Sequence, residues 1–151
     1  MFHSRALNNR INRLHERALR LAYKEPQLTF EELLIKDKSF SFHQRNLQKL
    51  AIEMYKFHRN LSPEIMKLVF QESTNTYNLR NRNPCTGRNV RTVYYGTETI
   101  SFRGPKIWAL VPEEIKASNT LEAFKSKIKT WRPEGCTCRL CKIYIHQIGF
   151  L

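Results

Sequence analysis

Two helix-start signals constrain the fold of this chain more than any other feature of its sequence. Thr29 is followed three residues later by Glu32, and Ser41 by Gln44. In such a capping box the hydroxyl accepts from the amide three residues on, and the longer side chain bonds back to the first amide. The boxes predict a short helix over residues 29–36 and a longer one from 41 to about 58. The longer helix is expected to bury Leu47, Leu50, Ala51, Met54 and Tyr55.

Another helix is predicted over residues 4–24, and Pro26 ends it. Residues at helical spacing form one apolar face, and cations three and four residues apart form a separate stripe on one flank. The apolar face consists of Leu7, Ile11, Leu14, Ala18, Leu21 and Ala22. The stripe consists of Arg10, Arg13, Arg17, Arg20 and Lys24.

The middle of the chain is expected to be less regular. Ser62 and Pro63 are typical of an N-cap and a first helical residue, so they predict a fourth helix that ends near residue 70. Residues 71–92 are rich in Asn, Thr and Arg and are predicted to form a loop or arm. Residues 93–102 carry β-branched and aromatic side chains around Gly96 and are predicted to form a short hairpin or two brief strands.

Gly104-Pro105 is expected to break the chain before a short helical turn that begins at residues 106–108. Asn119-Thr120 is expected to cap a final helix, with Leu121, Phe124, Ile128 and Trp131 on one face. The predicted fold is therefore mainly α: a helical domain of about five helices, with a small β-hairpin and a Cys-rich C-terminal tail. Its expected parts are a basic helical domain over 1–70, a basic loop or arm over 71–92, short strands and helices over 93–132, and the Cys-rich tail over 133–151.

The charge balance points to a polyanionic partner. The chain carries 26 Lys and Arg against 13 Asp and Glu, which gives a net charge of +13. Such a field favours nucleic acid first and an anionic membrane second, while a plain solvated basic surface is the alternative. We expect RNA or DNA as the partner and no membrane. The candidate nucleic-acid-binding residues are Arg10, Arg13, Arg17, Arg20 and Lys24 on the first helix and Arg80, Arg82, Arg88 and Arg91 in the arm.

The sequence excludes several kinds of enzyme. Asp37 is the only aspartate, whereas two-metal phosphoryl chemistry needs several converging carboxylates. Gly-rich phosphate loops, nucleophile elbows and His-Glu-x-x-His pairs do not occur in the sequence. No catalytic residues are predicted, and we expect a chain that is not an enzyme. The N-terminus lacks the apolar core of a secretory signal, so a cytoplasmic or nuclear location is expected.

The C-terminal tail carries a candidate metal site. Cys136, Cys138, Cys141 and His146 offer three sulfurs and one nitrogen, a common donor set for structural zinc. Part of this spacing matches a zinc knuckle, but Leu151 occupies the position of the last cysteine. Three interpretations stay open: a bound zinc ion, for which Cys85 is a substitute ligand; reduced cysteines without metal; or a redox pair.

Five blocks of the sequence, in order, resemble non-LTR (LINE) retrotransposon reverse transcriptases of the jockey-like type. They are LHERALRLAYKE with TFEELL, LQKLAIEMYKFHRNLSPEIMKLVF, YNLRN, the long block that contains SFRGPKIW, and the terminal CTCRLCKIYIHQIGF. The resemblance runs from about residue 9 to the end.

The resemblance implies a parent protein that is an RNA-directed DNA polymerase, whose catalytic aspartates would precede Met1. This chain would be its thumb-side and C-terminal region, retained as a fragment of a mobile element, with the polymerase domain as the N-terminal partner. Such a region is expected to grip template RNA or the primer-template duplex. Two alternatives are a protein-interaction domain that docks a partner through exposed aromatics such as Trp108, and a translated relic without retained function.

Overall fold

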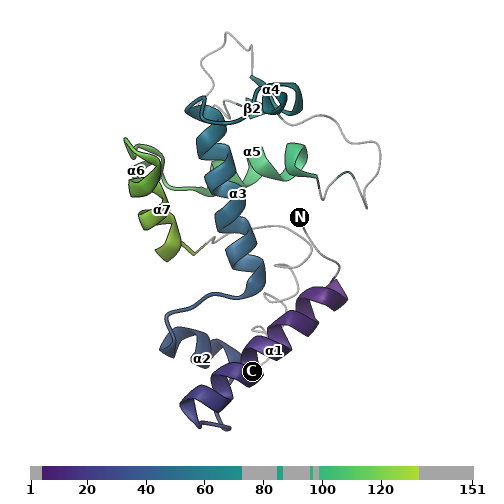
Figure 1. Cartoon of the computed structure of the whole chain (residues 1–151), viewed down its shortest axis with the longest axis vertical. Helices are drawn as coiled ribbons and strands as arrows, with labels where there is room; N and C mark the ends of the chain where they lie inside the picture. Colours follow the sequence, from purple (N-terminus) through teal and green to yellow (C-terminus); the bar gives the residue numbers. More distant parts are fainter. Residues whose placement is uncertain (1–4, 73–84, 87–95, 97–98, 133–151) are drawn as a thin grey trace. The chain divides into compact units, whose positions relative to one another are not determined.

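The computed structural model describes residues 5–72, 85–86, 96 and 99–132 (Figure 1). The described part of the chain is mainly helical, as the sequence predicts. Its helices are α1 (Arg5–Tyr23), α2 (Phe30–Lys36), α3 (Phe42–His58), α4 (Ile65–Val69), α5 (Ile100–Leu110), α6 (Glu113–Lys116) and α7 (Leu121–Thr130). Two short strands, β1 (Gln71–Glu72) and β2 (Cys85–Thr86), pair antiparallel, with Gln71 opposite Thr86.

The described residues divide into two compact units, the first ending at Asn46 and the second beginning at Leu47. In the first unit, α1 and α2 pack around Leu19, Leu33 and Leu34, which are buried. Tyr23, Leu28 and Phe30 cover this core.

Both predicted capping boxes are confirmed. The Thr29 amide donates to Glu32 Oε2 at 2.7 Å, and the Glu32 amide donates to Thr29 Oγ1 at 3.3 Å. The Thr29 amide, and the Thr29 hydroxyl at 2.8 Å, both donate to the Glu32 carboxylate and hold its pKa below the ordinary value. At the start of α3, the Ser41 amide donates to Gln44 Oε1 at 3.1 Å and the Gln44 amide to Ser41 Oγ at 3.3 Å. Because these contacts span only three residues, the sequence alone locates both helix starts.

The carboxyl ends of α2 and α3 share a C-capping motif. Lys38 and Asn60 adopt left-handed backbone conformations, with φ of 54° and 55°. The Ser39 amide then donates to Leu34 O at 2.9 Å, and the Leu61 amide to Lys56 O at 2.8 Å. This is the Schellman arrangement, which satisfies the last carbonyls of a helix and reverses the chain.

In the second unit, the predicted stripe of α3 is confirmed, since Leu47, Leu50, Ala51, Met54 and Tyr55 are all buried. The Tyr55 ring stacks on Phe124 of α7 at a centroid distance of 4.2 Å, and its hydroxyl donates to Ser118 O at 2.7 Å. Gln48 Nε2 donates to Trp131 O at 3.0 Å and to Lys129 O at 3.3 Å. These bonds attach the carboxyl end of α7 to α3.

The structure corrects three predictions in the second unit. Ile100, Ser101 and Phe102, predicted as strand, form the first turn of α5. Gly104-Pro105, predicted as a chain break, lies inside the same helix. The fourth helix begins at Ile65 and makes no side-chain cap, so the predicted N-cap at Ser62 is wrong.

Close packing against Met54 of α3 and against Phe70 explains the glycine inside this helix. Gly104 and Pro105 are both buried. A Cβ placed on Gly104 would lie 2.6 Å from Met54 Sδ and 3.0 Å from Phe70 Cε1. The glycine therefore lets α5 approach α3 closely, a tertiary requirement that overrides local propensity.

We expect Gly104→Ala to destabilise the fold despite the better helix propensity of alanine. Overpacking lowers the free energy of unfolding by about 1–3 kcal/mol, whereas the better helix propensity of alanine raises it by about 1 kcal/mol. Urea unfolding followed by circular dichroism measures the difference. In a Met54→Ala background the cost of Gly104→Ala should shrink, because the closest clashing atom is gone. A Gly104→Ala variant at least as stable as the natural chain would contradict this packing.

Candidate nucleic-acid interface

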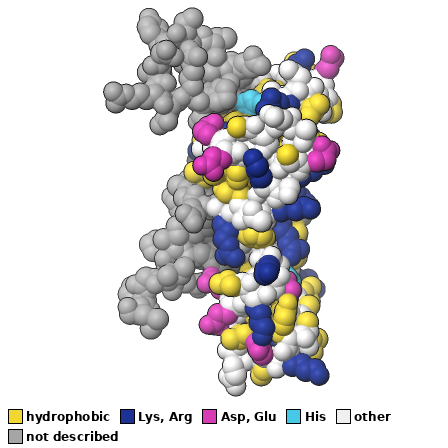
Figure 2. All heavy atoms as spheres, turned by 90° about the vertical axis from the view of Figure 1, so that its left-hand side faces the viewer, with side chains coloured by type: hydrophobic (Ala, Val, Ile, Leu, Met, Phe, Trp, Pro, Cys, Tyr) yellow, Lys and Arg dark blue, Asp and Glu magenta, His cyan; other side chains and the backbone are white. Residues whose placement is uncertain are grey.

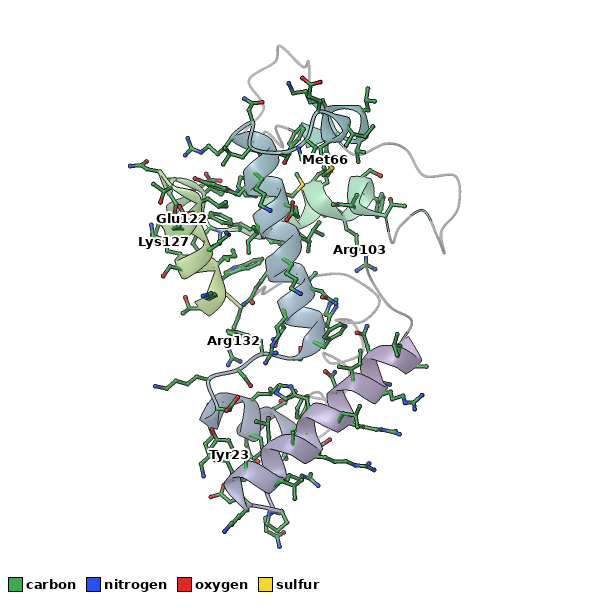
Figure 3. The ribbon with its side chains drawn as sticks, in the orientation of Figure 1. Tyr23, Met66, Arg103, Glu122, Lys127 and Arg132 are labelled. Atoms are coloured by element: carbon green, nitrogen blue, oxygen red, sulfur yellow. The ribbon has the colours of Figure 1, made fainter. Side chains whose placement is uncertain are left out.

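Four of the five cations predicted on the first helix lie on one exposed stripe of α1, and the fifth, Lys24, follows directly after Tyr23, the last residue of the helix. Arg10, Arg13, Arg17, Arg20 and Lys24 are all exposed. The four arginines follow one another at three- and four-residue intervals, so they extend over about 15 Å of helix. Figure 3 shows nitrogen-tipped side chains that project from α1 on the side away from α2. We call these five residues the cationic stripe.

Contacts on the opposite side of α1 fix the direction of this stripe. Leu19 is buried in the core shared with α2, and Tyr23 packs against that core. Asn12 is also buried, and its Oδ1 accepts from the amide of Phe42 at 3.3 Å. Asn8, Asn12, Leu19 and Tyr23 recur at helical spacing, so one face of α1 turns inward and the stripe turns outward.

The charges of the stripe are engaged to different degrees. Arg20 Nη2 lies 2.7 Å from Glu16 Oε1 and also donates to Leu28 O at 3.5 Å. In the part of the chain that the structure describes, no ion pair engages Arg10, Arg13 or Arg17. These three guanidinium groups therefore offer the stripe's available charge for an anionic ligand.

The only aspartate supports the turn between α2 and α3. Asp37 Oδ1 accepts from the Tyr23 hydroxyl at 2.9 Å. The nearby Ser39 side chain and the hydrogen bond from the Tyr23 hydroxyl hold the pKa of Asp37 below its ordinary value, and the bond between Tyr23 and Asp37 raises the pKa of Tyr23. Nearby, burial lowers the pKa of His15; the charge of Arg45 lowers it further, and the Asp37 carboxylate opposes the shift.

We expect His15 to titrate below its ordinary pKa of 6.5. Because the folded state then takes up this proton at a lower pH than the unfolded chain, the His15 contribution to stability is complete above the unfolded pKa of 6.5. It is lost as pH falls through the lowered pKa. Arg45→Gln should raise the His15 pKa, and Asp37→Asn should lower it. An NMR titration of the imidazole, with the urea-unfolded chain as reference, measures each shift. A His15 pKa above the unfolded value would contradict this arrangement.

The second unit carries exposed cations that the sequence analysis did not assign to binding. Lys49 of α3 and Lys129 of α7 are exposed. The bonds from Gln48 to the carboxyl end of α7 place that end beside the α3 turn that carries Lys49. Lys and Arg side chains are visible on the face where α6 and α7 lie (Figure 2). The sequence contains these cations, but only the packing of α7 on α3 shows that the segments carrying them lie side by side.

Other predicted site residues lie outside the described residues. They are Arg80, Arg82, Arg88 and Arg91 of the arm and Cys136, Cys138, Cys141 and His146 of the tail. Within the described residues, no group of three or more His, Cys, Asp or Glu side chains is arranged to hold a metal ion.

Trp108 is buried in the core of the second unit. Its ring stacks on His58 at 4.8 Å and lies 6.1 Å from Phe124. Lys116 Nζ lies 5.5 Å from the centre of the indole. This tryptophan therefore serves the fold and is not displayed for docking.

No protein-family model, no curated protein and no solved structure matches this sequence. Within residues 5–132, as far as they are described, no helix combines the length and the apolar character needed to cross a membrane.

Proposed function

We propose that this chain is a non-catalytic, nucleic-acid-binding segment that grips an RNA or DNA backbone through the cationic stripe of α1. The observation that carries the proposal is the joint exposure of four arginines along one side of α1, with Lys24 exposed directly after it, while Leu19 anchors the other side of the helix. Between Arg5 and Lys24 the chain holds six Arg and Lys and a single acid, Glu16. An extended row of fixed positive charge matches the regular negative charge of a phosphate backbone.

The resemblance of the sequence to jockey-like LINE reverse transcriptases supports a more specific form of this proposal. The segment would follow the polymerase core of such an enzyme and hold template RNA or the primer-template duplex near it. Residues 1–70 would be the thumb-like part, and the arm with Arg80, Arg82, Arg88 and Arg91 would add phosphate contacts. Lys49 and Lys129 would add phosphate contacts from the second unit.

The tail adds a question of metal content. Cys136, Cys138, Cys141 and His146 supply a donor set that fits structural zinc. Metal analysis of protein purified without added zinc distinguishes the two main readings. One zinc per chain, lost on Cys138→Ser, supports the metal site. Metal-free protein with titratable thiols supports reduced cysteines.

Neutralising the stripe should reduce the salt dependence of RNA binding. Each phosphate neutralised on a single strand contributes about 0.7 to the slope of log K against log salt, and on a duplex about 0.9. The triple substitution Arg10→Gln, Arg13→Gln and Arg17→Gln should therefore flatten the slope by about two to three units. Glutamine is chosen because its helix propensity is close to that of arginine. Fluorescence anisotropy of a labelled structured RNA over a salt series measures the slope.

A control variant with the same loss of net charge distinguishes a specific contact between α1 and RNA from a general effect of the positive net charge. Lys38→Gln, Lys67→Gln and Lys106→Gln remove three exposed cations outside α1. This control should keep most of the slope. Equal slopes for the stripe variant and the natural chain would remove α1 from the interface, and no binding at low salt would refute the proposed function.

A further inference from the structure

The apolar face predicted for the first helix is present, but the structure turns much of it toward solvent. Leu7, Leu14 and Leu21 are exposed by 41%, 59% and 80%. On the same helix, Asn8 and Asn12 are buried. Burying a leucine side chain stabilises a fold by about 1.5–3 kcal/mol, whereas burying an amide requires compensating hydrogen bonds. An arrangement that exposes leucines and buries asparagines leaves apolar surface that a partner can cover.

The three exposed leucines form a narrow ridge. They are spaced by seven residues, two helical turns, so they lie nearly in line along α1. Small Ala18 and Ala22 lie on the side of the ridge away from the cations. The cationic stripe lies on the other side, about 80° around the helix. We call Leu7, Leu14 and Leu21 the leucine ridge.

We propose that the leucine ridge docks an acidic amphipathic helix of a partner protein. Leucines of the partner would pack along the ridge, and its Glu or Asp side chains would face Arg10, Arg13 and Arg17. A seam of leucines at seven-residue spacing, bordered by charge on one side and small residues on the other, has the geometry of helix-to-helix packing. The positive charge of the arginines beside the seam favours a partner helix that carries negative charge. This role goes beyond the proposed nucleic-acid contact, which uses the cations and leaves the ridge uncovered.

Charge and shape disfavour other occupants of the ridge. A second copy of this chain would bring two cationic stripes and two net charges of +13 together. An anionic membrane suits a broad apolar face of leucines or aromatic residues, whereas this ridge is a single narrow row of three leucines. A phosphate backbone has no apolar surface to offer the leucines.

The test uses the full chain and a synthetic peptide about three heptads long. The peptide carries leucines along one seam and glutamates beside it; a scrambled peptide of the same composition spreads the leucines around the helix. Leu14→Gln with Leu21→Gln should weaken binding of the patterned peptide about tenfold or more. Ile35→Gln, which removes another side chain of the first unit that is 61% exposed, is the matched control and should leave binding unchanged. Isothermal titration calorimetry measures both, and circular dichroism verifies that each variant keeps its helix content.

RNA affinity measured on the same variants separates this proposal from the proposed function. Binding of the patterned peptide, lost in the leucine variant while RNA affinity stays unchanged, supports a docking ridge. Equal binding of the scrambled peptide would overturn it, because charge alone would then suffice. Ridge-dependent binding to phosphatidylserine vesicles without peptide binding, ridge-dependent dimerisation, or an equal loss of RNA affinity would each overturn it as well.

Discussion

Burial of Leu19 against Leu33 and Leu34 decides which way α1 faces, and both proposed surfaces depend on that direction. The contact joins α1 to α2, and the Tyr23–Asp37 and Asn12–Phe42 hydrogen bonds reinforce it. With this side turned inward, helical geometry directs the cationic stripe and the leucine ridge outward. A different inward side would bury leucines, as amphipathic patterning leads one to expect, and would redirect the arginines.

In the second unit, too, a small number of contacts determines how the helices pack. Tyr55 connects α3 to Phe124 by stacking and to Ser118 by a hydrogen bond, and Gln48 secures the end of α7. Arg59 also donates to Ser118 O at 3.0 Å. These few side chains hold α7 on α3, and with it the cations of its exposed faces. The cations of this unit therefore divide into those that support the fold, such as Arg59, and those that are exposed, such as Lys49 and Lys129.

Features that depend on near neighbours in sequence were predictable, and features that depend on tertiary partners were not. Thr29 and Ser41 cap their helices within one turn, so pattern alone located them. The helical role of Gly104 depends on Met54 and Phe70, which local propensity does not include. The spacing of the arginines in α1 predicted a stripe, but the exposure of Leu14 and Leu21 followed only from the anchor at Leu19. That the end of α7 lies beside the α3 turn that carries Lys49 likewise required the packed structure.

The most direct test of the account is an NMR titration of the isotope-labelled chain with a short single-stranded RNA, observing the arginine side-chain N–H groups. The account predicts that Arg10, Arg13 and Arg17 shift together as RNA is added, and that the shifts reverse when salt is raised. The side-chain N–H signals of Arg103, which is buried in α5, should keep their chemical shifts. Binding of RNA that leaves the α1 arginines unshifted would contradict the central claim that this helix contacts the nucleic-acid backbone.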